Sequence, residues 1–423
     1  MMIIGNSCVR ILLLVLLQSL LYCIVLSLNV SHEIKFNNEL KHLVSQASSK
    51  LPSKQRQEWT KHNNFRRFDK FGNNVGYTSG REYLEKAESK LLEALVDYQI
   101  STTKSGSCQQ ELVRPNHFSF GIVINGWAMI SESSRAEMLL RKMEELHASG
   151  EAVWLKPDVV KYTNVIKAYA KSYNRSQKGQ SSFIVNKVES ILKRMEESRD
   201  KNVRPNTLTY SVVIDLYAKV GNATKAIELL DRMELMYNEG NDKVRPNEVT
   251  YNACLNSLAK SEIVDAPKSA ENVLNRMETL YLRGNKHMKP SLISYSTVMN
   301  AYARRGNPER VESLLKSVKG RYAKGESMER PDRVMYNTAI SSWAKVDDVD
   351  APLRAEKLFK SMTEDENLQP NTITYNALLS VWMKNDIIGS PFAASRADAI
   401  LVKMEKEYEL SSGKSKIRPD ART

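Results

Sequence analysis

The side chains that most often carry out chemistry are sparse in this chain of 423 residues. It has four cysteines and six histidines, with no Cys-x-x-Cys and no His-x-Glu, so the spacings that structural zinc and zinc-dependent deaminases need are absent. Asp347, Asp348 and Asp350 are clustered, but they lie in a predicted turn. We therefore interpret them as a solvated loop rather than as the metal site of a nuclease. We therefore expect no catalytic residue, no metal and no cofactor.

A different set of residues recurs at intervals of 39 to 49 residues from Pro115 onward. Each copy has a Pro, usually followed by Asn or Asp, and then a Tyr, as in Pro205, Asn206 and Tyr210. Six copies carry a cation nine residues after the Tyr: Lys171, Lys219, Lys260, Arg304, Lys345 and Lys384. Stacked repeats align equivalent residues along one face, so this row predicts a ladder of cations suited to the phosphates of a nucleic acid.

The charge of the chain supports this interpretation. The sequence has 62 Lys and Arg against 49 Asp and Glu, a formal net charge of +13, which favours an anionic partner. The ten residues that start at the Tyr (Phe120 in the first copy) contain, over seven copies, seven bases and one acid, Asp215. Positive charge is therefore concentrated beside the ladder, which favours nucleic-acid binding over plain surface charge.

Two helices per copy must position these residues. After Tyr336, apolar residues at Ala339, Ile340 and Trp343 form one stripe of a helix, and a second stripe follows in the same copy. Gly-Asn pairs at 221–222 and 306–307 predict turns between paired helices. One helix pair cannot bury its apolar face alone, so stacked pairs must share a core. Large residues predicted to lie in that core are Trp127, Trp343, Trp382, Met195 and Met277.

The N-terminal residues differ in composition from the repeats. Residues 1–28 contain an apolar stretch with one preceding charge, Arg10, which is typical of a signal sequence, with an uncleaved membrane anchor as the alternative. Residues 29–80 are basic and lack a sustained apolar period, so we expect a second targeting segment or a disordered linker. We expect an incomplete first helical unit in residues 81–114, seven tandem repeats in 115–420 and the start of a truncated eighth in 421–423.

The copies resemble pentatricopeptide repeats from Pro115 to Asp420. The resemblance rests on the Pro-Asn/Asp start, the segment Val249-Thr250-Tyr251-Asn252, the Ala218-Lys219 end of a first helix and the Leu-Leu-x-x-Met pattern of the second helix. Tetratricopeptide repeats lack the leading Pro. The resemblance implies an all-α fold, a right-handed α-solenoid of tandem helix-turn-helix repeats that binds single-stranded RNA, one base per repeat. It implies no small-molecule substrate.

By this resemblance, each base is read by the residue after the Tyr and the residue after the next Pro. The pairs are Thr163 with Asn206, Ser211 with Asn247, Asn252 with Ser291, Ser296 with Asp332, Asn337 with Asn371 and Asn376 with Asp420. Asp only accepts hydrogen bonds and should favour the ring N–H of guanine or uracil, whereas Asn or Ser can donate to adenine or cytosine. A small residue after the Tyr leaves room for a purine. The predicted preference is 5′-A-A-C-G-Y-U-3′, where Y is a pyrimidine, after one base left open at Gly121 with Asp158.

The resemblance assigns two further roles. Apolar residues two positions before the Tyr are expected to sandwich each base, with ordinary packing between repeats as the alternative: Val160, Leu208, Val249, Ile293, Val334 and Ile373. The cation ladder is expected to contact phosphates. Together these roles predict a protein that acts on organellar transcripts in processing, stabilisation, editing or translation, without chemistry of its own.

Two other functions are compatible with the sequence. One is a protein-binding helical scaffold, which would be insensitive to salt and to charge reversal of the ladder. The other is an RNA-processing enzyme, since the chain stops at Thr423 before the next expected Tyr and a catalytic domain can follow there. Expected partners are RNA and other RNA-processing proteins, with a membrane only if the leader is retained. The expected compartment is a plastid or mitochondrion, or a membrane-anchored or secretory location as the alternative.

Overall fold

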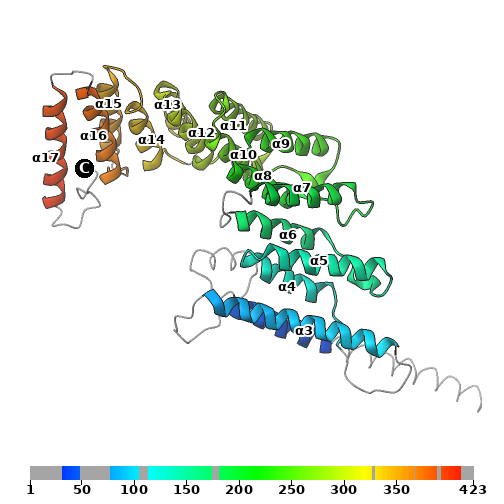
Figure 1. The fold of residues 1–423 in the computed structure, drawn as a ribbon. Coiled ribbons are helices and arrows are strands. Elements are labelled where there is room, and N and C mark those ends of the chain that lie inside the picture. Colours follow the sequence, from blue (N-terminus) through cyan, green and yellow to red (C-terminus); the bar gives the residue numbers. More distant parts are fainter. Residues whose placement is uncertain are drawn as a thin grey trace, which may run out of the picture. The chain divides into compact units, whose positions relative to one another are not determined.

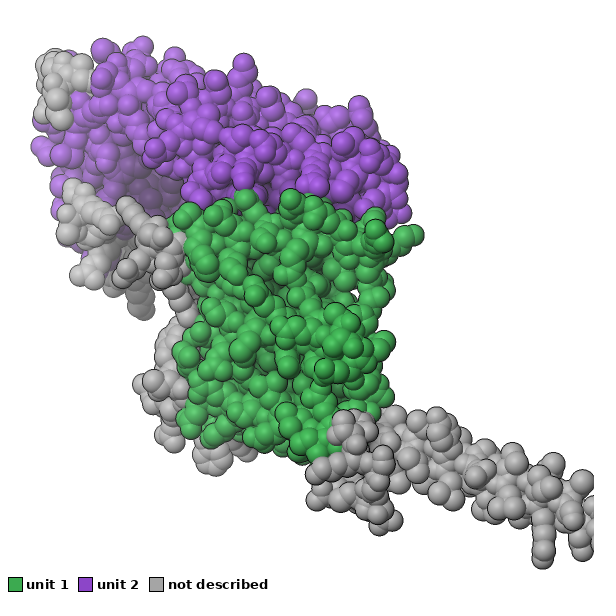
Figure 2. Space-filling view, turned by 45° about the vertical axis from the view of Figure 1, so that its right-hand side comes forward, with its two compact units in different colours: residues 1–212 green, residues 213–423 purple. Residues whose placement is uncertain are grey.

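The computed structural model describes residues 31–47, 77–103, 113–173, 181–325, 329–365, 367–387 and 392–410. Within these ranges the regular structure is helical, which confirms the all-α prediction. The chain divides into two compact units, Met1–Val212 and Val213–Thr423, which are coloured separately in Figure 2. Each unit is described by itself below.

Unit 1 contains a helix of residues 31–47 and the labelled helices that follow it (Figure 1). They are α3 (Tyr77–Thr103), α4 (His117–Met129), α5 (Ser133–Ala148), α6 (Val159–Ser172), α7 (Ser181–Glu197) and the first part of α8 (Thr207–Val220). Helices α4 and α5 pack as one pair, and α6 and α7 as the next. Helix α6 also packs on α4 and α5, so each first helix contacts both helices of the preceding pair.

Unit 2 repeats this arrangement. Beyond the end of α8 it contains α9 (Ala223–Asn238), α10 (Glu248–Lys260), α11 (Ala266–Leu282), α12 (Leu292–Arg304), α13 (Pro308–Ala323), α14 (Arg333–Trp343), α15 (Ala351–Thr363), α16 (Thr372–Ile387) and α17 (Ala393–Leu410). The pairs α10 with α11, α12 with α13, α14 with α15 and α16 with α17 all pack together. First helices α10, α12, α14 and α16 are neighbours in turn, so residues at equivalent positions lie on adjacent first helices.

The residue after the repeat Pro starts each first helix because its side chain satisfies a backbone N–H that the helix leaves unpaired. The Asn247 side chain accepts a hydrogen bond from the backbone N–H of Thr250 at 3.0 Å. The Thr250 hydroxyl in turn accepts one from the backbone N–H of Asn247, which completes a capping box. The turn prediction is also confirmed: Gly221 has a φ of 81°, which suits glycine, and Asn222 then caps α9.

The predicted core residues are buried. Trp127, Trp343, Met195 and Met277 have no exposed surface and Trp382 retains 8%. The long turns before the repeat Pro are anchored in this core by an apolar residue two positions ahead of the Pro, for which burial is favourable. These anchors are Leu155, Val203, Val244, Met288 and Leu368. The anchors explain why turns of unequal length still deliver the residue after the Pro to the same cap position.

The N-terminal segment differs from the expectation of disorder. Residues 31–47 form a helix whose Phe36, Leu40 and Val44 are buried, and burial of that stripe outweighs the polar composition that led to the disordered interpretation. Helix α3 begins at Tyr77, ahead of the predicted boundary at 81. The leader of residues 1–28 lies outside the described residues. Among the described residues, no helix meets the length and apolarity needed to cross a membrane.

Candidate nucleic-acid interface

The predicted base-reading residues that follow the repeat Pro all lie at the start of a first helix where they are described. Asn206, Asn247 and Asn371 each accept, through Oδ1, a backbone hydrogen bond from the residue three positions on, at 3.0 to 3.1 Å. The cap therefore occupies the amide oxygen and leaves the NH₂ group, which can only donate, for a ligand. Donation from this NH₂ group to adenine or cytosine stays a prediction.

Asp332 has the opposite chemistry at the same position. Its Oδ1 accepts from the backbone N–H of Met335 at 2.9 Å, which caps α14. The second carboxylate oxygen can only accept a hydrogen bond, and its preference for the ring N–H of guanine or uracil stays a prediction. Ser291 is also a cap residue: the Ser294 hydroxyl accepts from its backbone N–H at 3.2 Å.

The structure brings two of the predicted base-reading pairs together through a third side chain. Thr209, the residue before Tyr210, has its hydroxyl 2.8 Å from that of Thr163 and 3.1 Å from Oδ1 of Asn206. We call such a residue, directly before the repeat Tyr, the connector. It joins the residue after the Tyr of one repeat to the cap residue of the next.

The second linked pair lies in unit 2. The connector Ser294 donates its hydroxyl to Oδ1 of Asn252 at 2.7 Å and lies 3.3 Å from the Ser291 hydroxyl. The Asn252 amide nitrogen also donates to Glu248 at 3.3 Å. The two linked pairs thus share one geometry although their residue types differ.

Two of the remaining predicted pairs lack such a link in the part of the chain that the structure describes. Among the described residues, no hydrogen bond joins a connector to both members of the Ser296 and Asp332 pair or of the Asn337 and Asn371 pair. Oδ1 of Asn337 is buried without a hydrogen-bond partner among the described residues, which is costly unless a ligand supplies a donor. Ser211 and Asn247 fall in different units, and Asp420, the partner of Asn376, lies outside the described residues.

Two predicted reading residues lie below the surface. Thr163 is 2% and Ser211 7% exposed. Their hydroxyls donate to the carbonyls of Val159 and Thr207 in the preceding helical turn, both at 2.7 Å. A base can contact either hydroxyl directly only if the hydroxyl gives up its hydrogen bond to the carbonyl. The cap residues, by contrast, are only half-buried.

The predicted sandwiching residues are exposed, although they are apolar. Val160, Leu208, Val249, Ile293, Val334 and Ile373 are between 47% and 69% exposed, as is Phe118 in the first repeat at 63%. Each lies two positions before a buried Tyr or Phe, in the first turn of a first helix. Side chains packed between repeats are usually covered, whereas these present apolar surface to solvent.

The predicted phosphate contacts have mixed environments. Lys260 and Lys345 are exposed. Lys219 pairs with Asp215 at 2.8 Å, Lys384 with Asp347 at 2.9 Å, and Arg304 donates to the Ala259 carbonyl at 2.8 Å. Lys171 is half-buried at the end of α6. The ladder of six equivalent cations is therefore partly neutralised by nearby acceptors.

Comparison with protein-family models identifies the repeat family of these helix pairs. A PPR repeat family model matches residues 205–260, a PPR repeat model matches 293–322, and a pentatricopeptide repeat domain model matches 143–217 and 329–385. The chain is a pentatricopeptide repeat protein.

Individual relatives of this pentatricopeptide repeat protein are distant. A chloroplastic pentatricopeptide repeat-containing protein of Arabidopsis thaliana is 27% identical over 143 residues, which are 34% of this chain and 23% of the relative. The crystal structure of the pentatricopeptide repeat protein PPR10 from maize matches at 17% identity with a TM-score of 0.30, covering 78% of this chain and 52% of that chain. The chain thus spans about half or less of the proteins it matches.

The first repeat of this pentatricopeptide repeat protein departs from the others. A Cβ added at Gly121 would lie 3.2 Å from Cε of Lys161, the connector of the next repeat. The Lys161 ammonium is buried and pairs with Asp158 at 2.8 Å. The absence of a side chain at Gly121 is therefore explained by the lysine stem that fills the space beside it.

Sequence reasoning missed a recurring cluster that holds adjacent repeats together. In unit 2, the Tyr251 hydroxyl donates to Glu234 of the preceding second helix, and Arg276 of the following second helix pairs with the same carboxylate. The sets Tyr162, Glu144, Arg194 and Tyr295, Glu278, Arg321 repeat it. Burial, followed by the hydrogen bond to Glu144, raises the pKa of Tyr162 to about 12. The Met-Glu dipeptides at 143–144, 233–234 and 277–278 were the available sequence signal.

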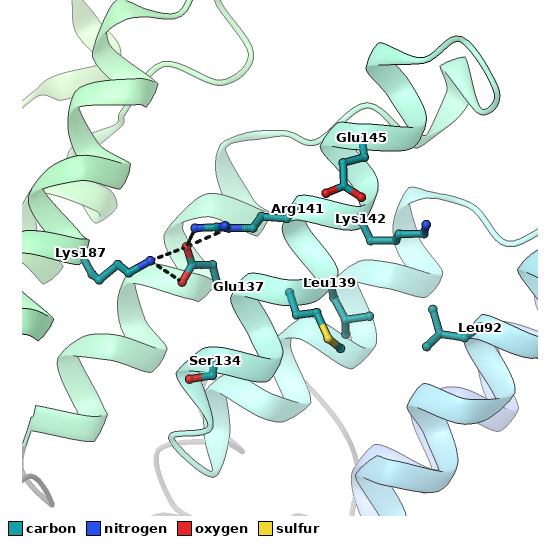
Figure 3. A pocket seen from close by; sticks show the side chains of 9 residues that line it. Leu92, Ser134, Glu137, Leu139, Arg141, Lys142, Glu145 and Lys187 are labelled. Carbon is teal, nitrogen blue, oxygen red and sulfur yellow. Dashed lines mark hydrogen bonds and ion pairs between the residues drawn. The ribbon is translucent and has the colours of Figure 1, made fainter.

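A second cluster lines a surface cavity of about 510 Å³ beside α5 (Figure 3). Arg141 and Lys187 converge on Glu137 at 2.7 and 3.3 Å, and Tyr169 donates to the same carboxylate. Burial disfavours the ionised carboxyl, but the hydrogen bonds from Tyr169, Arg141 and Lys187 outweigh it and keep the pKa of Glu137 below its usual value. The charges of this cluster pair with one another, as those of Glu271 and Arg310 do beside Tyr302.

Proposed function

We propose that this chain binds single-stranded RNA and reads one base per repeat. The observation that carries the proposal is the row of exposed apolar side chains, each beside a polar cap residue whose hydrogen-bonding direction is fixed by its helix. Exposed apolar side chains that recur at one structural position can pack against the faces of successive bases, a role that aromatic side chains have in other single-strand binders. The fixed caps then distinguish donor from acceptor edges.

The expected sequence preference is 5′-A-A-C-G-Y-U-3′. Fluorescence anisotropy with this RNA and a scrambled RNA of the same composition tests it, and equal affinity for both would rule out base reading.

Ile293→Ser should weaken binding several-fold without lowering the thermal midpoint, because the Ile293 side chain is 69% exposed and contributes little to the core. Leu282→Ser is the matched control, since Leu282 is 79% exposed at the end of a second helix, α11. Comparable losses in both variants would contradict the stacking role of Ile293.

The proposed setting is an organelle, where the protein would act in transcript processing, stabilisation, editing or translation without chemistry of its own. The chloroplastic name of the Arabidopsis relative supports a plastid, and a mitochondrion is the alternative outcome. Among the described residues there is no group of three or more His, Cys, Asp or Glu side chains placed to hold a metal ion. Imaging of a fluorescent fusion of residues 1–80 tests the location, and secretion or plasma-membrane labelling would contradict it.

A further inference from the structure

The helix of residues 31–47 contacts α4 through the same polar geometry as the linked base-reading pairs. Ser119, directly before Phe120, is the connector of the first repeat. Its hydroxyl lies 2.8 Å from Oδ1 of Asn37 and 3.2 Å from Oδ1 of Asn116. The corresponding distances are 2.8 and 3.1 Å around Thr209, and 2.7 and 3.3 Å around Ser294. Asn37 therefore has the position of a residue that follows a repeat Tyr.

The neighbours of Asn37 fit the same register. Phe36, directly before it, is 6% exposed and takes the place of the buried Tyr. Leu40 and Val44 follow at four and eight residues and are buried, as expected for the core stripe of a first helix. Ile34, two residues before Phe36, is 55% exposed, within the range of the stacking residues of the other repeats. Family models match no residue before 143, so this register comes from the structure.

Helix α3 completes the unit as its second helix. It buries Leu84, Leu91 and Leu95, and Lys90 pairs with Glu39 of the helix 31–47. Gly126 of α4 packs closely against Leu84 and Val44. A Cβ at this position would lie 2.6 Å from a methyl carbon of Leu84 and 3.2 Å from one of Val44. Figure 1 shows the helix 31–47 alongside α3, below α4 in that view. The two helices thus stack on the first repeat as a helix pair.

We propose that residues 31–47 and α3 form an additional N-terminal repeat in which Asn37 and Asn116 read one further base. This proposal rests on the proposed function. Oδ1 of Asn37 is occupied by the Ser119 hydroxyl, and Oδ1 of Asn116 accepts from the backbone N–H groups of Phe118 and Ser119 at 3.0 and 3.1 Å. Both amide groups consequently present NH₂ donors, and Ile34 provides the stacking surface.

The chemistry of the site favours cytosine. Cytosine offers two acceptors, O2 and N3, to the two amide groups, and its exocyclic amino group can donate to a carboxylate. Glu33 places a carboxylate there, because its Oε2 accepts from Nδ2 of Asn116 at 3.2 Å. A uracil would place its N3–H against an NH₂ donor, and a purine must fit beside an Asn rather than a small side chain. The extended preference is 5′-C-N-A-A-C-G-Y-U-3′, in which N is the base left open at Gly121.

The test uses the full chain with the synthetic RNAs 5′-CUAACGCU-3′, 5′-AUAACGCU-3′ and 5′-UAACGCU-3′. The 5′ cytosine should tighten binding about tenfold over the shorter RNA, the size expected for one stacked and hydrogen-bonded base, and the 5′ adenine should give much less. Asn37→Ala should remove the gain from cytosine and leave affinity for the shorter RNA unchanged. Asn38→Ala is the control, because Asn38 is exposed on the same helix.

A change of preference separates a reading role from loss of structure. Asn116→Asp, made together with Glu33→Gln so that the new carboxylate does not face that of Glu33, keeps a good helix cap but replaces donors by acceptors. The preferred 5′ base should therefore change from cytosine to uracil. Equal affinity of the wild-type chain for all three RNAs, with the preference for AACGCU over its scramble retained, would overturn the additional repeat alone. Loss of that core preference as well would instead show that the proposed function is wrong.

Discussion

At the residue scale, the cap position closes a helix and is also the position that we propose to read a base. One oxygen of Asp332 closes the first turn of α14, and the other remains an acceptor at the surface. Asn at the same position closes the turn equally well but presents a donor instead. A single Asp-to-Asn exchange thus changes the hydrogen bonds available to a ligand without changing the helix.

This predicts that Asp332→Asn moves the preference at the fourth base of the hexamer from guanine to adenine. The ratio of affinities for AACGCU and AACACU should reverse by about tenfold or more, since each mismatched donor or acceptor costs about 1–3 kcal/mol. Titration of both RNAs against both proteins measures it. Asp350→Asn is the control with the same charge change, because Asp350 is exposed and caps α15 without a side-chain hydrogen bond. An unchanged ratio in Asp332→Asn would remove this residue from the reading set.

At the element scale, helix pairs are held together by tyrosine–glutamate–arginine clusters in addition to apolar burial. Tyr251, Glu234 and Arg276 come from three different helices. We predict that Glu234→Gln lowers the free energy of unfolding by about 1–3 kcal/mol, because it removes the charge that Tyr251 and Arg276 share and leaves Arg276 with Asp231 as its carboxylate partner. Urea denaturation followed by circular dichroism measures it, with the exposed Glu228→Gln on the same helix as control. A change no larger than in the control would show that apolar packing alone joins these repeats.

The carboxylates of these clusters should also make stability pH-dependent. Burial disfavours ionisation of Glu271, but hydrogen bonds from Arg310 and Tyr302 prevail and lower its pKa. A carboxyl whose pKa is depressed in the folded state stabilises the fold above the unfolded value, about 4.3, and loses that effect as the pH falls through the folded value. Thermal midpoints should therefore fall more between pH 5 and pH 3 in the wild type than in Glu271→Gln. Parallel curves for the two proteins would contradict this.

The elements also show which parts of the site can be predicted from sequence. The repeat Pro, the cap residue and the Tyr each meet a local need of one helix, so they recur in the sequence and were found there. The helix 31–47 has no leading Pro and has Phe36 where the repeats have Tyr, so its role emerges only from its contacts with α4. The glutamates of the tyrosine clusters recur in Met-Glu dipeptides, but only folding brings them to their Tyr and Arg partners, so the dipeptides alone do not predict the clusters. The pairing of Lys219 with Asp215, four residues apart on one helix, was visible in the sequence.

At the scale of the whole molecule, the net charge of +13 does not translate into an equal number of phosphate contacts. Many cations pair with carboxylates of the clusters, and Lys219 and Lys384 of the ladder also have acidic partners. Lys260, Arg304 and Lys345 are exposed ladder cations of unit 2, and Arg304 donates to the backbone carbonyl of Ala259. The electrostatic part of RNA binding should therefore depend on a few positions rather than on overall charge.

Salt titrations can separate these contributions. Each phosphate contact to a single strand contributes about −0.7 to the slope of log K against log salt concentration, so Lys260→Gln with Lys345→Gln should make the slope shallower by about 1.4. The matched control is Lys268→Gln with Lys357→Gln, which removes the same charge from exposed positions on the second helices α11 and α15. The control should change affinity slightly and leave the slope unchanged, because counterions are released only where phosphates bind. Equal slopes in the two double variants would mean that the RNA backbone does not follow the ladder, and a wild-type slope near zero would favour a protein-binding scaffold.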